Sequence, residues 1–168
     1  LRDLGSACSP DNAFAIIQGL ETVALRMKQH CGNAQKVVEF LKKHKEVTKV
    51  IYSTEHSKPI ADRAKKYLKG GNGPMVGIEL KGGIEAGKRF IESLKMFYHV
   101  ANIGDARSLA IHPASTTHSQ LNEKELAASG VTQSYVRLCI GIEHIDDIID
   151  DLDQALNNSS KGSLKAVS

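Results

Sequence analysis

The chain has 168 residues, of which 41% are hydrophobic and 24% are charged, and its net charge is 22 − 19 = +3 at neutral pH. A chain of this length can bury one solid core, and the composition is that of a globular protein rather than a disordered or membrane-embedded one. Because only 5% of the residues are aromatic and no apolar run reaches the ~20 residues of a membrane span, we expect neither a nucleic-acid partner nor a membrane span.

A long helix is predicted near the N-terminus, over about residues 10–43. Ser9 can cap it, Pro10 suits the first helical position, and Asp11 favours the positive end of the helix dipole. We expect a bend near Gly19 or Gly32. The basic run LKKHKEVTK at the end is interpreted as a solvated helix terminus, because it lacks interleaved aromatic residues. The apolar residues recur at steps of four and three in one stripe: Leu20, Ala24, Met27, Cys31, Ala34, Val38 and Leu41.

Shorter elements are predicted in the middle of the chain. A strand is expected over Lys49–Tyr52 and a helix over Ser57–Leu68, with Pro59 in its first turn. The glycine-rich GGNG is interpreted as a turn, since it has neither the spacing nor the Gly-Lys-Ser/Thr ending of a phosphate loop. The segment MVGIEL over Met75–Leu80 alternates as a strand does, and a second amphipathic helix follows it, carrying Ile84, Gly87, Ile91 and Leu94.

The last third of the chain contains two strands and two helices. One strand includes Arg107–Ile111 and leads into SLAIHPASTTH, which turns at Pro113. Asn122 and Glu125 have the spacing of a capping box for a short helix that ends near residue 130. The segment YVRLCIGI (135–142) is a strong strand, and the final helix carries Ile145, Ile148, Ile149, Leu152 and Leu156.

Helices thus alternate with short strands, which indicates an α/β fold with the character of a small α+β domain. We expect one domain over residues 1–158, in which a small sheet packs against helices, and a flexible tail over 159–168. Several connections are short, and for this reason the sheet is expected to be largely antiparallel.

Several patterns that suggest chemistry have a simpler interpretation. Asp146, Asp147 and Asp150 form D-D-x-x-D, the spacing that binds magnesium-diphosphate in terpenoid synthases, but this chain is too short for their helical cavity. We interpret these carboxylates as the exposed face of a helix. The histidines lack the spacing of a zinc site, and no metal is expected: His112, His118 and His144.

The cysteines indicate the redox compartment of the protein and do not suggest a catalytic role. Cys8, Cys31 and Cys139 are odd in number and far apart, which favours a reducing compartment such as the cytoplasm over a disulfide framework. Cys139 lies within an apolar strand, where a thiol is usually inert, and so we do not expect it to act as a nucleophile.

Arg137 is the most informative residue of the chain. In YVRLCIGI, the apolar residues Val136 and Leu138 share one face of the strand, while Arg137 lies on the other. A guanidinium fixed on a strand is well suited to bidentate binding of a carboxylate or phosphate. From the spacing alone, a structural salt bridge with an acidic residue of the chain is an equal alternative.

Three segments together resemble a known family: GLETVALRMKQHC, SLAIHPASTTH and VRLCIGIEHIDDIIDDLDQAL. They are similar, in the same order, to the C-terminal part of the Cys/Met-metabolism enzymes that use pyridoxal phosphate. The resemblance implies the smaller C-terminal domain of the aspartate-aminotransferase type of fold (fold type I), with the long helix leading into it. It further implies a cytoplasmic homotetramer as the full-length enzyme.

Within that family, the sequence looks most like the members that convert O-acetyl-L-homoserine and sulfide to L-homocysteine and acetate by γ-replacement. The resemblance assigns Arg137 to the substrate's α-carboxylate and places Ser108 in the same carboxylate site. For His112, Thr116, Thr117 and His118, it implies only a part in shaping the loop.

Two departures from the family pattern are apparent. Cys139 stands where relatives usually have serine, which should leave Arg137 in place. The Schiff-base lysine and the contacts to pyridoxal phosphate belong to the preceding large domain of the family, so we expect no cofactor-binding or catalytic residue within these 168 residues. The alternatives are a cystathionine γ-synthase or γ-lyase of the same family, or a stand-alone module that binds or assembles without catalysis.

Overall fold

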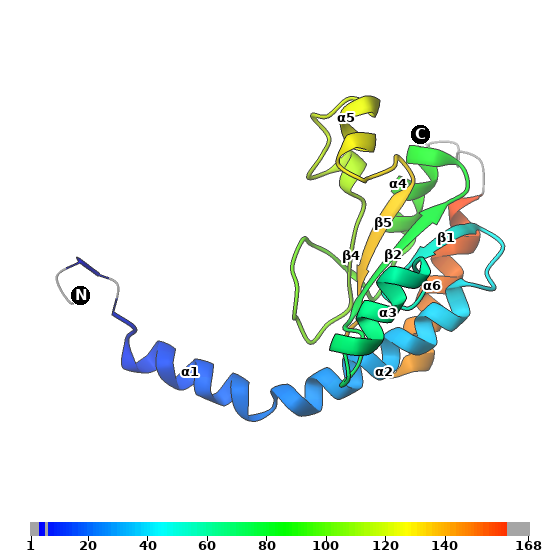
Figure 1. Ribbon diagram of the computed structural model, residues 1–168. Coiled ribbons are helices and arrows are strands. Elements are labelled where there is room, and N and C mark those ends of the chain that lie inside the picture. Colours follow the sequence, from blue (N-terminus) through cyan, green and yellow to red (C-terminus); the bar gives the residue numbers. More distant parts are fainter. Residues whose placement is uncertain (1–3, 6, 161–168) are drawn as a thin grey trace.

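The computed structural model describes residues 4, 5 and 7–160, and within them a five-stranded sheet carries helices on both sides (Figure 1). The strands are β1 Val47–Ile51, β2 Met75–Leu80, β3 Tyr98–His99, β4 Leu109–Ile111 and β5 Tyr135–Cys139. The helices are α1 Pro10–Glu21, α2 Val23–Leu41, α3 Lys58–Tyr67, α4 Gly83–Ser93, α5 Glu123–Ala128 and α6 Ile145–Ser159, with a short 3-10 turn at Pro113–Ser115.

The sheet has the order β1-β2-β5-β4-β3, so β5 lies at its centre although it is the last strand in the sequence. The β1–β2, β2–β5 and β5–β4 pairs are antiparallel, and only β3 runs parallel to its neighbour. This arrangement confirms the predicted α/β fold with a small, largely antiparallel sheet. Strand β3 was not predicted, because a segment of two exposed residues is too short to show an alternating pattern.

The two faces of the sheet differ in their neighbours. Val136 and Leu138 of β5 pair with Ile78 and Val76 of β2, and they pack with α2, α4 and α6 in the hydrophobic core. Arg137 lies between these residues in sequence and therefore on the opposite face. The alternation predicted for YVRLCIGI is thus present in the structure, and it separates an apolar core face from a face that carries a charged residue.

The predicted long helix over 10–43 is instead two helices, and this corrects the expectation. The interruption is at Thr22, close to Gly19, where one of the two possible bends was expected, while α2 continues through Gly32 (Figure 1). The guanidinium of Arg26 donates to the Gly19 carbonyl at 2.6 Å, a carbonyl that a continuous helix would pair with the backbone N–H of Val23. The break therefore comes from a side chain that replaces a backbone donor, a cause that periodicity does not reveal.

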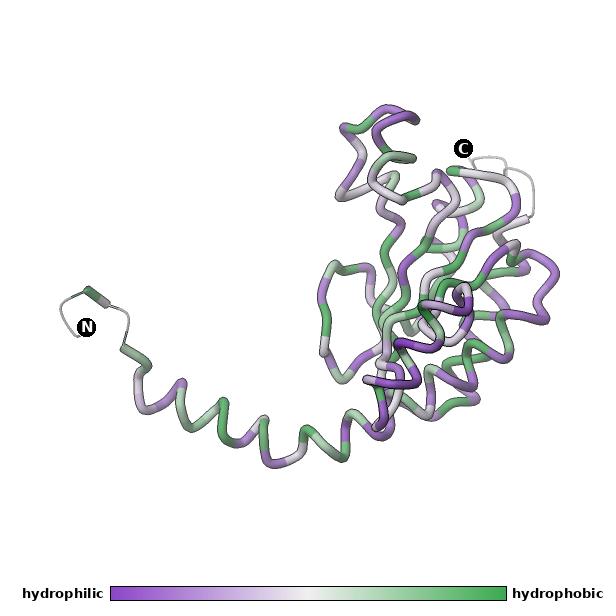
Figure 2. Tube along the Cα trace, viewed as in Figure 1, coloured by the Kyte–Doolittle hydropathy of each residue, from purple (hydrophilic) through white to green (hydrophobic). Residues whose placement is uncertain are grey.

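The apolar stripe of these helices is only partly buried. No residue of α1 is buried, and its hydrophobic residues are spread along an exposed helix that extends away from the sheet (Figure 2). Leu20 and Met27 belong to the predicted apolar stripe, yet they are 61% and 39% exposed. Burial begins at His30 and includes Asn33, Ala34, Val37, Val38 and Leu41.

The final helix is longer than its apolar pattern predicted. It continues to Ser159, which is fully buried and donates its hydroxyl to the Leu156 carbonyl at 2.7 Å. Ser159 was placed at the start of the predicted flexible tail, and it belongs to the helix instead. Residues 161–168 of that tail lie outside the described residues.

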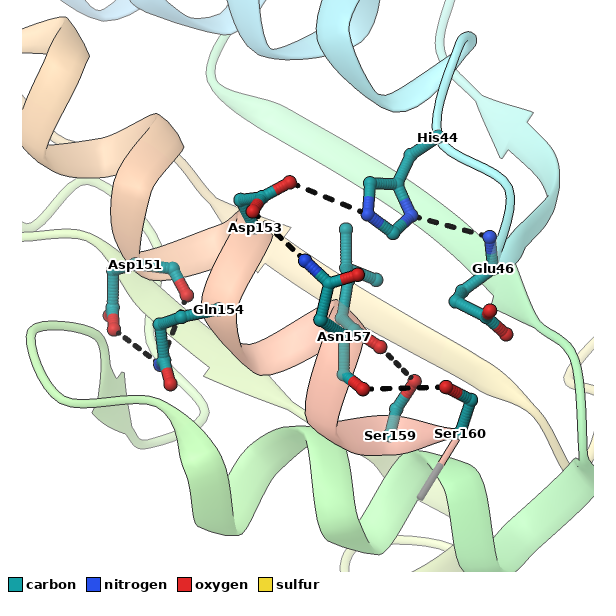
Figure 3. Close-up of polar contacts among 9 residues, drawn as sticks. His44, Glu46, Asp151, Asp153, Gln154, Asn157, Ser159 and Ser160 are labelled. Atoms are coloured by element: carbon teal, nitrogen blue, oxygen red, sulfur yellow. Dashed lines mark hydrogen bonds and ion pairs between the residues drawn. The ribbon is translucent and has the colours of Figure 1, made fainter.

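One aspartate of the acidic run has a structural role that the sequence pattern did not predict. Asp151 is only 7% exposed, and its carboxylate accepts a hydrogen bond from Gln154 of the same helix (Figure 3). The same carboxylate accepts from three consecutive backbone N–H groups after α4, at 2.8–3.2 Å, those of Lys95, Met96 and Phe97. Asp151 thereby joins α6 to the segment that leads into β3. By contrast, Asp146, Asp147 and Asp150 are exposed, as expected.

Replacing Asp151 should destabilise the fold. In Asp151→Ala, the backbone N–H groups of residues 95–97 lose their acceptor, and we expect the free energy of unfolding to fall by about 3 kcal/mol. The matched control is Asp150→Ala, an exposed neighbour on the same helix, which should change it by less than about 0.5 kcal/mol. Urea denaturation of both variants measures the difference, and equal stabilities would show that Asp151 does not join the two segments.

Candidate functional site

The candidate site is centred on Arg137, in the middle of β5. Gly77 of β2 lies beside it on one side and Ile111 of β4 on the other, as its cross-strand partners. Because β5 is held by neighbours on both edges, the Cα position of Arg137 is fixed by the sheet rather than by a loop. Its side chain projects from the face opposite the core.

The guanidinium of Arg137 is incompletely paired. Its Nη2 donates to the backbone carbonyl of Asn102 at 3.4 Å, while its Nε is buried and has no hydrogen-bond partner among the described residues. No ion pair joins Arg137 to an acidic residue within that part of the chain. The structural salt bridge considered from the sequence is therefore not formed there. A buried donor without a partner costs about 1–3 kcal/mol, and an acceptor supplied from outside the chain would recover that cost.

A pocket of about 390 Å³ opens beside Arg137. Its sheet side is formed by Arg137, Tyr135 and Gly77. Its other side includes Tyr52 and His56 from the segment between β1 and α3, and Ile60 from α3 itself. Larger hollows of about 490 and 590 Å³ lie between α2 and α6 and along α3, but neither contains a buried unpaired side-chain atom within the described residues. We therefore regard the smaller hollow as the candidate binding site.

Both tyrosines of this pocket are neutral at physiological pH. Burial raises the pKa of Tyr52 to about 12, with a smaller contribution from nearby Cys31, and its hydroxyl donates to the Gly73 carbonyl at 2.8 Å. Burial also raises the pKa of Tyr135, and the positive charge of Arg137 partly opposes this shift. The pocket thus combines one permanent positive charge with phenol groups that keep their protons.

Ser108 does not line this pocket, although the sequence placed it in the same site as Arg137. Ser108 is fully buried and precedes β4, so the alternation of the strand puts it on the side of Ala110. Ala110 pairs with Leu138 on the core face, whereas Ile111 pairs with Arg137. The residue that approaches Arg137 from this part of the chain is Asn102, in the loop between β3 and β4.

Ser108 instead belongs to a compact hydrogen-bond cluster with Glu143 and Gly141. The carboxylate of Glu143 accepts from the backbone N–H of Ser108 at 2.6 Å and from its hydroxyl at 2.9 Å. The same hydroxyl oxygen accepts from the N–H of Gly141 at 2.9 Å. A Cβ at position 141 would lie 2.5 Å from the Ser108 nitrogen, so only glycine allows this close approach.

Helix α2 holds the other side of this cluster. The Nδ1 of His30 donates to the Ile140 carbonyl at 2.6 Å, since a carbonyl can only accept. The Asn33 amide donates to the carbonyls of Gly141 and Glu143 at 3.1 and 2.9 Å. The turn that follows β5 is therefore tied to both α2 and β4, and the strand carrying Arg137 is anchored at its C-terminal end.

The histidine that opens HPASTTH is a buried structural residue. His112 donates from Nε2 to the Gln133 carbonyl at 2.8 Å, which leaves Nδ1 to accept from the Ser115 hydroxyl at 2.8 Å. Its ring packs against Gly87 of α4, where a Cβ would lie 2.5 Å from Cδ2. Burial lowers the pKa of His112, so the ring is neutral at physiological pH. These contacts support the interpretation that the motif shapes a loop.

The lysines of the described residues lie mostly at the surface. Every lysine among them is exposed except Lys88, which is partly exposed, and none lines the pocket of Arg137. In the same part of the chain, no group of three or more His, Cys, Asp or Glu residues could hold a metal ion. None of the helices there is long and apolar enough to cross a membrane.

Comparisons with known proteins agree on one family. Residues 1–157 match the family described as Cys/Met metabolism PLP-dependent enzyme. The chain is 54% identical over 159 residues to the O-acetyl-L-homoserine sulfhydrylase of Leptospira meyeri, a match that covers 94% of this chain and 36% of that protein. It is 44% identical over 157 residues to the L-methionine gamma-lyase of Fusobacterium nucleatum subsp. polymorphum, covering 93% of this chain and 40% of the other.

A solved structure from Campylobacter jejuni, described as an O-acetylhomoserine (thiol)-lyase, superposes with a TM-score of 0.83 at 44% identity. It matches 93% of this chain and 37% of its own length, and it carries N'-pyridoxyl-lysine-5'-monophosphate at its position 205. This likeness confirms the fold predicted from the resemblance, that of part of a fold type I enzyme. The chain spans little more than a third of the length of these proteins.

The buried state of His112 predicts a pH-dependent stability. Its folded-state pKa lies below the unfolded value of 6.5, so the unfolded chain binds a proton first as the pH falls. The contribution of neutral His112 to the free energy of unfolding is complete above pH 6.5. It decreases as the pH falls towards the folded-state pKa, by at most about 1.4 kcal/mol per pH unit.

Urea denaturation between pH 7.5 and 5, values chosen to bracket the unfolded pKa of about 6.5, tests this expectation. His112→Gln should have a shallower pH dependence than the parent chain, while His56→Gln, at an exposed position between β1 and α3, should leave it unchanged. Identical slopes for the parent chain and His112→Gln would mean that His112 does not titrate differently in the two states.

Proposed function

The chain belongs to the Cys/Met metabolism family of PLP-dependent enzymes, and from this premise we propose that it is the C-terminal substrate-carboxylate domain of an O-acetylhomoserine sulfhydrylase. The reaction would be the γ-replacement that converts O-acetyl-L-homoserine and sulfide to L-homocysteine and acetate. The family's cofactor, when bound, supplies an electron sink for carbanions. The 54% identity to the Leptospira meyeri sulfhydrylase favours this member of the family.

The observation that carries the proposal is the buried, unpaired Nε of Arg137 beside an open pocket. A guanidinium presents N–H groups in a planar fork that matches the two oxygens of a carboxylate. Arg137 is fixed on the central strand, so a carboxylate bound to it would have a defined position relative to the rest of the site. Holding the α-carboxylate fixes the direction of the Cα–H bond that must react, and this orientation is the part that Arg137 contributes to catalysis.

Ser108 serves this site from a distance. Its hydroxyl is fully used by Glu143 and Gly141, so we assign it to holding β4 against the end of β5 and not to contact with substrate. We propose that pyridoxal phosphate is held by residues of the longer polypeptide outside these 168, and that the 168-residue chain alone has no activity. The native enzyme would then be a cytoplasmic homo-oligomer, a tetramer in the full-length family.

A second reaction of the same family is the main alternative. The 44% identity to an L-methionine gamma-lyase supports a γ-lyase, and a cystathionine γ-synthase remains a further alternative. The sequence ASTTH favours the sulfhydrylase, because the lyases and cystathionine synthases tend to have methionine before the threonine. Assaying the full-length enzyme with sulfide and then with cysteine as the acceptor decides between them. A stand-alone binding or assembly module would instead require a native polypeptide of about this length, which its mass would reveal.

Arg137→Ala in the full-length enzyme should raise KM for O-acetyl-L-homoserine by roughly 10- to 100-fold, since a hydrogen bond to a charged group is worth about 1.5–3 kcal/mol. Arg137→Lys should restore only part of the affinity, because an ammonium group cannot bind both oxygens in the same plane. Arg63→Ala, at an exposed position of α3, is the control and should leave KM unchanged. An unaltered KM in Arg137→Ala would mean that Arg137 is only structural.

A further inference from the structure

The ring of Tyr135 lies against Gly77 on the face of the sheet that carries Arg137. Tyr135 precedes Arg137 by two residues on β5, so both side chains project from the same face. Gly77 is the cross-strand partner of Arg137 on β2. A Cβ at position 77 would lie 2.6 Å from Cε2 of the Tyr135 ring and 2.9 Å from its hydroxyl oxygen. The ring therefore occupies the space that a side chain at position 77 would fill.

This arrangement brings the phenol group to the strand position next to Arg137. Directly paired residues on antiparallel strands have Cβ atoms about 4.5–5.5 Å apart, and the Tyr135 hydroxyl lies against the Gly77 member of that pair. The positive charge of Arg137 lowers the pKa of Tyr135 and so partly opposes the larger, raising effect of burial. Tyr135, Gly77 and Arg137 together line the same pocket.

The Tyr135 hydroxyl has no hydrogen-bond partner within the part of the chain that the structure describes. This distinguishes it from Tyr52 in the same pocket, whose hydroxyl is used by the Gly73 carbonyl. The pocket thus contains two donors without an acceptor, the Tyr135 hydroxyl and the buried Nε of Arg137. Two such donors on one wall match a ligand with two acceptor oxygens.

We infer that Tyr135 is a second binding residue for the substrate α-carboxylate, which accepts from the Tyr135 hydroxyl and from the Arg137 guanidinium together. The inference rests on the proposed function of Arg137. Gly77 is then a positioning residue, because its missing side chain allows the phenol ring to lie across the strand. A phenol that keeps its proton is a suitable partner, since a hydrogen bond from a neutral hydroxyl to a carboxylate is short and strong.

Tyr135→Phe in the full-length enzyme loaded with pyridoxal phosphate tests the inference, because it removes one hydroxyl and keeps the ring. We expect KM for O-acetyl-L-homoserine to rise roughly tenfold, while kcat changes by less than about twofold. Tyr67→Phe is the matched control, the same substitution on an exposed tyrosine of α3, and it should change neither constant. A wild-type KM in Tyr135→Phe would overturn the inference.

A substrate analogue separates carboxylate binding from a merely structural effect. The carboxamide of O-acetyl-L-homoserine lacks the negative charge, so the ratio of KM between Tyr135→Phe and the parent enzyme should fall towards one. A ratio that stays near tenfold with the carboxamide would show that the hydroxyl acts elsewhere, and the inference would be wrong.

Gly77→Ala tests the positioning role. The added methyl group should displace the ring and raise KM about as much as Tyr135→Phe does, with a wild-type kcat. In the double variant, KM should be no higher than in either single variant, because both changes remove the same hydrogen bond. A multiplied effect would contradict the assignment of Gly77. Thermal unfolding midpoints, measured alongside, identify any variant that is simply less stable.

Arg137→Lys, measured in the same assay, separates the proposed carboxylate site at Arg137 from the additional role of Tyr135. A raised KM in Arg137→Lys together with an unchanged KM in Tyr135→Phe would retain the proposed function and refute the role of Tyr135. An unchanged KM in both variants would refute the carboxylate site itself and, with it, the inference.

Discussion

The carboxylate of Glu143 is the group on which the geometry of the site depends. It accepts both donors of Ser108 and so joins the start of β4 to the turn that follows β5. The strand that carries Arg137 and the loop that brings Asn102 to it are held in register by this contact. Gly141 is required within it, because a Cβ there would collide with the Ser108 nitrogen and with the Ala106 carbonyl oxygen.

The buried polar side chains of the described residues otherwise have hydrogen-bond partners, and for this reason the unpaired Nε of Arg137 is informative. Asp151 accepts from the backbone of three residues, His112 uses both ring nitrogens, and Asn33 donates to two carbonyls. Among the described residues, only the Nε of Arg137 is a buried side-chain nitrogen or oxygen without a partner. Folded proteins rarely leave such a donor unpaired, so an acceptor supplied from outside these residues is the explanation that the proposed site offers.

Much of the fold followed from local patterns. The strand Met75–Leu80 was predicted with its observed bounds, and the capping box of Asn122 and Glu125 begins α5 as expected. These features depend on residues that are close in sequence, and for this reason a single sequence contains them. The position of Arg137 opposite the core face was predicted for the same reason, since the alternation of a strand is a local property.

Most of the features that could not be predicted depend on contacts between distant segments. Ser108 directly precedes β4 and Arg137 lies in the neighbouring β5, yet the register of β4 against β5 turns their side chains to opposite faces. No local pattern specifies that register. The break at Thr22 depends on a side chain that competes for a backbone carbonyl, and the burial of Asp151 depends on where the segment after α4 passes. The sequence by itself determined most of the helices and strands, the strand that carries Arg137 and the family. Tertiary structure alone decided which side chains meet around Arg137, because the pairing of distant strands places Tyr135 over Gly77 and Asn102 beside the guanidinium.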